Sequence, residues 1–231
     1  MTESTVWALV PASGVGRRMQ SAVPKQYLRI AGKTVLEHTL DRISACPSVT
    51  KMMVAISPQD NHYIGLDYAQ SKLDQVIEGG VQRADSVRNM LTALVVIDPN
   101  SWALVHDAVR PCVRIDDVER LIKTATQKNY GGLLGAPMAD TVKQVNVSDE
   151  VVKSVPRESL WRAFTPQLFR ASELLASLEN GANVTDEASA IENAGGRVFM
   201  LEGSPDNLKI TRPADLALAQ LILKAQFGQN T

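Results

Sequence analysis

The sequence has few of the residues on which metal centres and disulfide frameworks are built. It contains two cysteines, Cys46 and Cys112, and three histidines scattered along the chain. Two cysteines cannot form a disulfide framework, and their spacing does not match that of metal ligands. The three histidines do not indicate a zinc site either. This composition agrees with a protein of the reducing cytoplasm.

The sequence also lacks a large net charge and long apolar runs. The 231 residues carry a formal net charge of −1, which argues against a general nucleic-acid or anionic-membrane binder. The first five residues have no basic region, and the apolar run after them is too short for a signal peptide or a membrane span. We expect a cytoplasmic protein with neither a nucleic-acid nor a membrane partner, and a single domain over residues 1–231.

The most informative segment is residues 11–19, Pro-Ala-Ser-Gly-Val-Gly-Arg-Arg-Met, which follows the apolar run 6–10. A strand that opens into a small-residue loop and then a helix exposes several backbone N–H groups to one anion. Gly14 and Gly16 carry no Cβ, so the backbone can approach a phosphate closely. The segment predicts a phosphate-binding loop.

Nearby cations refine this prediction. Arg17, Arg18 and Lys25 add positive charge that suits a triphosphate better than the pyrophosphate of a dinucleotide. The segment has no Gly-Lys-Ser/Thr ending, and Met19 stands at the third glycine position of the dinucleotide fingerprint, so neither familiar phosphate loop fits. The alternative is a tight strand–helix turn whose arginines are solvated.

Strand-like and helical patterns alternate along the chain, which predicts an α/β fold with a mostly parallel sheet covered on both faces. The predicted strands are 5–10, 51–57, 73–78, 102–106, 131–137, 197–202 and 207–210, and the predicted helices are 34–45, 59–70, 83–97, 115–128, 168–179, 186–194 and 213–226. Ligands of such sheets bind at the carboxyl ends of the strands, where residues 11–19 and 106–110 are expected to lie.

One stretch interrupts this alternation. Two β-branched runs, 141–147 and 151–155, flank a polar turn at 148–150 and predict a hairpin within an arm of about residues 138–160. An isolated two-stranded hairpin is marginally stable in water, so the arm is expected to pack against another surface. A partner subunit is the preferred candidate, and folding back onto its own domain is the alternative.

A carboxylate at a strand end gives a candidate metal ligand. Asp107 follows the apolar strand 102–105 and precedes Arg110. Magnesium is usually held by one or two carboxylates together with substrate phosphates, so Asp107 opposite a phosphate loop predicts a Mg²⁺ site. An Asp107–Arg110 ion pair that closes a loop is the alternative. His106 is interpreted as a packed strand-end residue without a catalytic role.

Three further polar segments are weaker signals. The glycine-rich loop at 79–86 offers backbone groups and the Ser86 hydroxyl to a nucleobase. Thr185, followed by acidic residues, is typical of a helix N-terminus. Lys209 lies in the strand-like run 207–210, where an anionic ligand or an exposed sheet edge would explain it. No Ser/His/Asp or Cys/His arrangement indicates a protein nucleophile.

Taken together, the segments 11–19 with 24–27, 79–86, 106–111, 185–189 and 207–213 resemble, in order and spacing, the 2-C-methyl-D-erythritol 4-phosphate cytidylyltransferases of the non-mevalonate isoprenoid pathway. The resemblance covers about residues 6–223. It implies a Rossmann-like nucleotidyltransferase domain and a homodimer joined through the extended β-arm. The chain departs from the family at Ser13 and Val109, where alanine is usual, and at Val81, where an acidic residue is frequent.

The resemblance also implies roles for individual residues. The triphosphate of CTP would be held by the loop and two cations, Pro11, Ala12, Ser13, Gly14, Gly16, Arg18 and Lys25, and cytosine would be read by Gly80, Val81 and Ser86. Asp107 would hold Mg²⁺, and Lys209 would face the reacting phosphate. The sugar-alcohol phosphate would be bound by Arg110 and Thr185 and, from the partner's arm, by Thr141 and Arg157.

The implied reaction is attack by the phosphate oxygen of 2-C-methyl-D-erythritol 4-phosphate on the α-phosphorus of CTP, which releases pyrophosphate. Catalysis would rest on positioning and electrostatic stabilisation by Mg²⁺, Arg18, Lys25 and Lys209. One alternative is a cytidylyltransferase of the same fold that acts on ribitol 5-phosphate. The other, of a different class, is a nucleotide-binding regulatory module without turnover.

Overall fold

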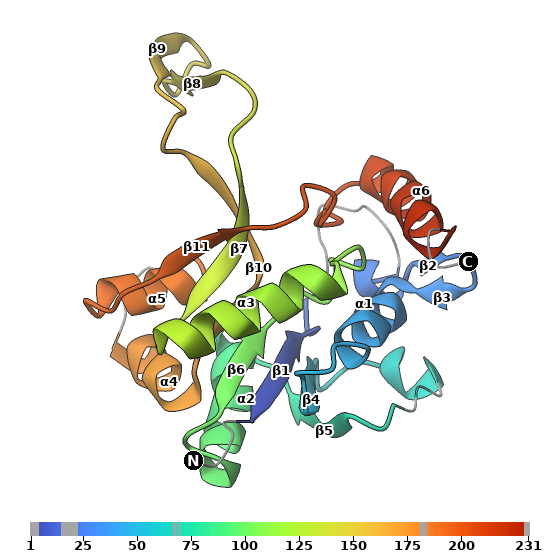
Figure 1. Ribbon diagram of the computed structural model, residues 1–231. Helices are drawn as coiled ribbons and strands as arrows, with labels where there is room; N and C mark the ends of the chain where they lie inside the picture. The colour runs from blue at the N-terminus through green and yellow to red at the C-terminus, as the bar shows by residue number, and fades with distance from the viewer. Residues whose placement is uncertain (1–4, 15–22, 67, 69, 181–183, 229–231) are drawn as a thin grey trace.

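The computed structural model describes residues 5–14, 23–66, 68, 70–180 and 184–228. A seven-stranded sheet in the order β11-β7-β10-β6-β1-β4-β5 forms the centre of the molecule (Figure 1). Its strands are β1 (Val6–Pro11), β4 (Lys51–Ile56), β5 (Leu73–Glu78), β6 (Trp102–Val105), β7 (Gly132–Pro137), β10 (Trp161–Arg170) and β11 (Phe199–Glu202). Every neighbouring pair is parallel except the two that β10 makes with β6 and β7. The predicted α/β class with a mostly parallel sheet is confirmed.

Helices cover both faces of this sheet. They are α1 (Val35–Ser44), α2 (Arg83–Ile97), α3 (Ile115–Lys128), α4 (Ala171–Asn180), α5 (Glu187–Asn193) and α6 (Pro213–Gly228). On β1, Trp7 and Leu9 join the core formed with α2, α4 and α5, whereas Val6 and Ala8 join the core formed with α1 and α3. Because both faces of β1 are buried, its sequence is an uninterrupted apolar run and does not alternate with polar residues.

Local signals in the sequence fixed several helix ends. The Thr34 hydroxyl accepts from Glu37 N at 3.1 Å, and the Glu37 carboxylate accepts from Thr34 N at 2.6 Å, which is a complete capping box at the start of α1. Helix α6 begins at Pro213, where a missing N–H costs nothing. Both features agree with the sequence prediction.

Two predicted elements are wrong, and a third begins three residues later than predicted. In the described residues of the predicted helix 59–70 there is a single 3₁₀ turn, Tyr63–Leu66, because Asp60 accepts the backbone N–H groups of His62 and Tyr63 and so competes with helical bonding. The predicted strand 207–210 is a loop whose backbone makes tertiary hydrogen bonds instead. Of these, Ile210 N donates to Val109 O at 2.9 Å.

The third difference concerns the chain that returns from the arm. Residues 168–170, predicted as helical, end the ten-residue strand β10, and α4 begins only at Ala171. The chain leaves the sheet along β7 and must come back in the opposite direction, so β10 pairs antiparallel with β7. Its apolar side chains then fill both faces, with Leu168 in one core and Phe169 in the other.

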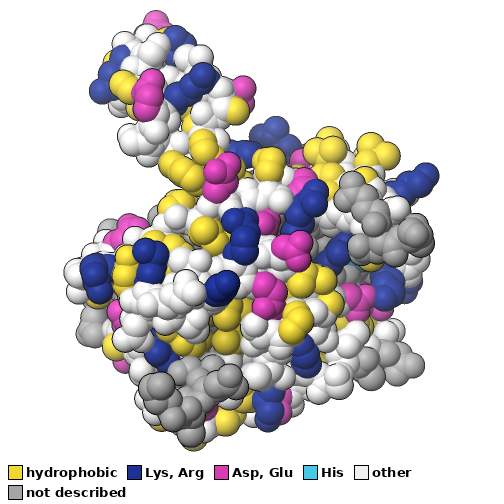
Figure 2. Space-filling view, in the orientation of Figure 1, with side chains coloured by type: hydrophobic (Ala, Val, Ile, Leu, Met, Phe, Trp, Pro, Cys, Tyr) yellow, Lys and Arg dark blue, Asp and Glu magenta, His cyan; other side chains and the backbone are white. Residues whose placement is uncertain are grey.

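The arm projects from the carboxyl end of β7 as a separate hairpin (Figure 1). Its strands β8 (Val142–Val145) and β9 (Val151–Val155) pair antiparallel, as predicted. Four of its valines are 49–105% exposed: Val145, Val147, Val151 and Val152. Hydrophobic and charged side chains lie beside one another on its surface (Figure 2). Among the described helices, none is long and apolar enough to cross a membrane.

Candidate active site

A pocket of about 160 Å³ opens where β1 and β6 end. Twelve residues line it: Pro11, Ala12, Ser13, Gly14, Lys25, Gln26, Val81, Arg83, Asp107, Ala108, Val109 and Lys209. They come from four of the segments that the sequence singled out. The structure therefore brings the predicted phosphate loop, the base loop, Asp107 and Lys209 to one place, at the sheet edge where ligands of parallel sheets bind.

The described part of the phosphate loop, residues 11–14, is held from behind by Gln26. This side chain is 3% exposed, and its amide donates to Ala12 O at 2.8 Å and to Gly14 O at 3.0 Å. Because Pro11 has no N–H and Ala12 N donates to Ala55 O at 2.7 Å, Ser13 and Gly14 carry the remaining N–H groups of these four residues. The sequence prediction missed Gln26, although it lies beside Lys25. Gly16 and Arg18 lie outside the described residues.

Lys25 follows Pro24 and begins the 3₁₀ turn Lys25–Tyr27. Its Nζ atom donates to Ile210 O at 3.0 Å, which brings it to the loop that carries Lys209. The neighbouring Tyr27 is 6% exposed and donates to the Asp60 carboxylate at 2.6 Å. Burial and the Asp60 carboxylate raise the pKa of Tyr27, so it stays a neutral donor that anchors the turn.

Asp107 stands at the centre of the site, with its side chain only 6% exposed. Its carboxylate lies 2.8 Å from Arg83 Nε, 2.8 Å from Lys209 Nζ and 3.4 Å from Arg110 Nε. Burial by itself would raise the pKa of Asp107, but these three cations outweigh it and hold the pKa well below its usual range. Asp107 is therefore ionised at any physiological pH. The predicted alternative, an ion pair with Arg110, is present as one of the three contacts.

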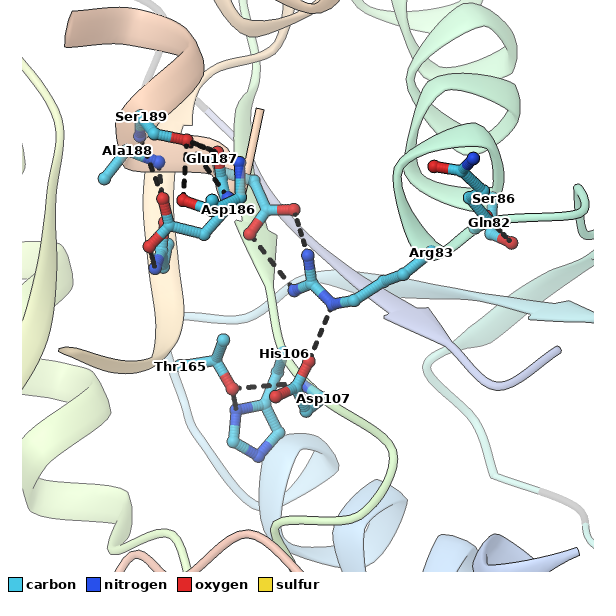
Figure 3. Close-up of polar contacts among 12 residues, drawn as sticks. Gln82, Arg83, Ser86, His106, Asp107, Thr165, Asp186, Glu187, Ala188 and Ser189 are labelled. Atoms are coloured by element: carbon cyan, nitrogen blue, oxygen red, sulfur yellow. Dashed lines mark hydrogen bonds and ion pairs between the residues drawn. The ribbon is translucent and has the colours of Figure 1, made fainter. Parts of the chain in front are cut away.

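Arg83 is a second pocket-lining residue that the sequence analysis overlooked. It is the first residue of α2, and besides Asp107 it binds both carboxylate oxygens of Glu187, at 2.7 and 3.1 Å (Figure 3). Glu187 is 2% exposed and lies in the first turn of α5. The two carboxylates raise the pKa of Arg83 against the lowering effect of burial. The sequence feature that could have identified Arg83 is its position at a helix start beside the glycine-rich loop, but its two carboxylate partners are distant in sequence.

His106 packs beneath the site, as predicted, and lines no part of the pocket. It is fully buried, with Nε2 3.1 Å from Arg110 O and Nδ1 3.2 Å from the Thr165 hydroxyl (Figure 3). Burial lowers the pKa of His106 to about 4, so the imidazole is neutral at pH 7. The Thr165 hydroxyl also accepts from Asp107 N at 3.0 Å, which fixes the backbone that carries the central carboxylate.

The four residues predicted to bind the sugar-alcohol phosphate do not lie together in this single chain. Arg110 is buried, and its guanidinium donates to Asn207 O at 2.6 Å. Thr185 is exposed beside the N-terminus of α5, but the N-cap residue is Asp186, whose carboxylate accepts from Ser189 N. The N-cap position that the sequence analysis gave to Thr185 is thus corrected by one residue, because it is the Asp186 carboxylate that accepts the third helical N–H, from Ser189.

Two other predicted residues lie on the arm. Thr141 and Arg157 are exposed and are not among the residues that line the pocket. The Arg157 guanidinium donates to Ala139 O, across the base of the hairpin.

Lys209 occupies a loop, where the sequence analysis expected a strand. Its ammonium group is paired with Asp107, so neither a strand edge nor a bound anion is needed to explain its position. Among the described residues, no group of three or more His, Cys, Asp or Glu side chains is placed to hold a metal ion. Asp107 is the carboxylate at the pocket that can contribute to such a site.

Comparisons with known proteins settle the family. The sequence model of the 2-C-methyl-D-erythritol 4-phosphate cytidylyltransferases matches residues 6–225. The chain belongs to this family. The enzyme of this name from Photobacterium profundum is 47% identical over 225 residues, covering 94% of this chain and 95% of that protein. The one from Hahella chejuensis is 45% identical, with 97% and 95% covered.

Solved structures agree with this assignment. The crystal structure of the Francisella tularensis 2-C-methyl-D-erythritol 4-phosphate cytidylyltransferase is similar with a TM-score of 0.81 and 35% identity, over 95% of this chain and 100% of that chain. A 4-diphosphocytidyl-2C-methyl-D-erythritol synthase is similar with a TM-score of 0.85, 36% identity, and 96% and 99% covered. The predicted activity, 2-C-methyl-D-erythritol 4-phosphate cytidylyl transfer in isoprenoid biosynthesis, is confirmed, and the ribitol phosphate and regulatory alternatives are set aside.

Proposed function

We propose that this pocket binds CTP, with the triphosphate on residues 11–14 and the cytosine on the loop 79–82. The observation that carries the proposal is the convergence of a backbone phosphate loop, Lys25 and Lys209 on a buried carboxylate. Gly16 and Arg18 extend the same loop in sequence and are assigned to the triphosphate. Gly80, Val81 and Ser86 are assigned to the base, with Val81 contributing its backbone because its side chain is fully exposed.

The proposed reaction needs no nucleophile from the protein. A phosphate oxygen of 2-C-methyl-D-erythritol 4-phosphate forms a bond to the α-phosphorus of CTP, and the bond to the β-phosphate oxygen breaks, with pyrophosphate as the leaving group. Arg18, Lys25 and Lys209 neutralise charge that develops on the phosphoryl oxygens. Fixed cations of this kind act mainly on the transition state because they need no reorganisation when the charge appears.

The residues present fit a bound Mg²⁺ ion. Asp107 offers one ionised carboxylate beside the triphosphate site, and magnesium is commonly held by one or two carboxylates plus substrate phosphates. When bound, the ion would supply Lewis-acid stabilisation of the phosphates. In the ligand-free chain both Asp107 oxygens are engaged by Arg83 and Lys209. A triphosphate would compete for Lys209, so Asp107 and the nucleotide together define the proposed metal site.

We also propose that the active enzyme is a homodimer joined through the β-arm. The hairpin 142–155 exposes four of its valines in the single chain, and a two-stranded hairpin is marginally stable alone. A partner subunit that covers these valines would stabilise the arm and receive Thr141 and Arg157 at its substrate site. Arg110 and Thr185 would complete that site from the subunit that holds CTP.

Pyrophosphate release tests the proposed substrates. The purified protein is incubated with CTP and Mg²⁺, with 2-C-methyl-D-erythritol 4-phosphate as acceptor in one arm and ribitol 5-phosphate in the other. We expect release with the first acceptor and a much smaller rate with the second. Equal rates would contradict the assignment of the arm and Thr185 to the branched acceptor, and omission of Mg²⁺ without effect would contradict the metal site.

A further inference from the structure

We propose that Ser13 is a specificity-determining residue, because its hydroxyl group fixes the base loop (residues 79–82) against the phosphate loop (residues 11–14) through Ser86. The Ser13 and Ser86 hydroxyl oxygens lie 2.7 Å apart, although 73 residues separate them in sequence. This inference rests on the proposed function, which assigns the base loop to cytosine.

The Ser86 hydroxyl group joins three groups of the protein. A serine hydroxyl has one hydrogen and two lone pairs. Ser86 Oγ has three contacts, to Gly80 N at 3.1 Å, to Gln82 O at 3.3 Å and to Ser13 Oγ at 2.7 Å. Gly80 N donates to Ser86 Oγ, and the single hydrogen of Ser86 goes either to Gln82 O or to Ser13 Oγ. Ser13 is the donor in the first case and the acceptor in the second, and in both cases the bridge joins the two loops.

Ser86 is enclosed by the protein. Its side chain is completely buried, and its three contacts all lie within the protein (Figure 3 shows it beside Gln82). Ser86 therefore supports the loop that is assigned to the base. Ser13, which lines the pocket, is the residue that connects this arrangement to the nucleotide.

Packing reinforces the connection between the two loops. Gly79 N donates to Ile56 O at 2.7 Å, and a Cβ added at Gly79 would lie 2.5 Å from Ser13 Cβ. The two loops are thus in direct backbone-to-side-chain contact, with no room for a residue larger than glycine at position 79. The hydroxyl bridge adds a directed bond to this contact.

Rigidity of the base loop matters for discrimination between bases. Cytosine presents an amine where uracil presents a carbonyl oxygen, so a loop that accepts from cytosine faces uracil with two acceptors. The mismatch is costly only when the loop cannot move away from the wrong base. Removing the Ser13 bridge lets the base loop adjust, and uracil is then tolerated better relative to cytosine.

The test is a double-mutant cycle on nucleotide preference. The ratio of kcat/KM for CTP to that for UTP is measured for the wild type, Ser13→Ala, Ser86→Ala and the double variant. Ser13→Ala keeps the Cβ atom that packs on Gly79, and melting temperatures are recorded for every variant. We expect Ser13→Ala to lower the ratio roughly two- to tenfold, the range that one net hydrogen bond supports. In the Ser86→Ala background, Ser13→Ala should lower it no further.

A matched control comes from the same helix. Thr92 on α2 bonds to Arg88 O at 2.9 Å and lies away from the pocket lining, so Thr92→Ala should leave the ratio unchanged. An equal loss of kcat/KM for both nucleotides in Ser13→Ala would overturn the specificity role, and so would independent, multiplying effects of Ser13 and Ser86.

Two outcomes separate this inference from the proposed function. If Ser86→Ala changes the ratio and Ser13→Ala does not, the bridge is refuted while the base loop assignment stands. If no variant changes the ratio, the base loop does not read the nucleotide, and both the inference and that part of the proposed function fail.

Discussion

Replacing Asp107 with asparagine removes the one charge around which the site is organised. The asparagine side chain keeps the shape of aspartate but carries no charge, and its amide group turns N–H donors toward neighbouring cations. Arg83, Lys209 and Arg110 would then face one another with Glu187 as their remaining anionic partner at this site. We expect Asp107→Asn to lower both the stability of the fold and the turnover.

The structure sets the size of the stability effect. Removing one partner of a buried ion pair costs about 3–5 kcal/mol. Arg83 and Lys209 are 32% and 38% exposed, so solvent screens part of the repulsion, and we take the lower end, about 3 kcal/mol. For a chain of this size, each kcal/mol lowers Tm by about 2–4 °C, which gives a decrease of about 10 °C.

The assay combines thermal unfolding with pyrophosphate release across a Mg²⁺ titration, at a temperature well below both transitions. Asp206→Asn is the matched control, because Asp206 pairs with the 44% exposed Arg114 away from the pocket. Loss of this exposed ion pair should cost no more than about 1 kcal/mol, so the Tm of Asp206→Asn should fall by no more than about 4 °C. An unchanged Tm in Asp107→Asn refutes the electrostatic argument, and near-normal turnover at any Mg²⁺ concentration refutes the metal assignment.

Three further predictions test other parts of the site. Gln26→Glu removes both donors to the phosphate loop and should weaken CTP binding by roughly tenfold or more, as two lost hydrogen bonds imply; unchanged affinity in a binding titration would show that Gln26 does not support the loop. The pKa of the buried His106 is about 4 in the folded chain and about 6.5 in the unfolded chain, so between these pH values the unfolded chain binds more protons. Stability should therefore fall by up to about 3 kcal/mol as pH drops from 6.5 to 4. Chemical denaturation should find a flatter profile in His106→Gln than in the wild type, and parallel profiles would contradict the assignment. Mixing Arg157→Ala subunits with Asp107→Asn subunits should restore one working site per heterodimer if Arg157 serves the neighbouring subunit; no recovery after verified subunit exchange would reject the shared site.

Features that depend on neighbouring residues could be derived from the sequence. The apolar run of β1, the small residues after it and the capping box at Thr34 each express a local rule of strand burial, backbone freedom or N–H satisfaction. The hairpin of the arm also followed from two β-branched runs around a polar turn. For the same reason the candidate phosphate loop and Asp107 could be singled out from sequence, and both line the pocket.

Tertiary structure alone decided how these pieces meet. Strand β10 runs antiparallel because the chain must return from the arm, and this constraint overrides the helical spacing of residues 168–170. Arg83 gains its role from Asp107 and Glu187, which lie 24 and 104 residues away. Local patterns carry no information about such partners, because ion pairs between distant residues form only when packing brings them together and removes the water between them.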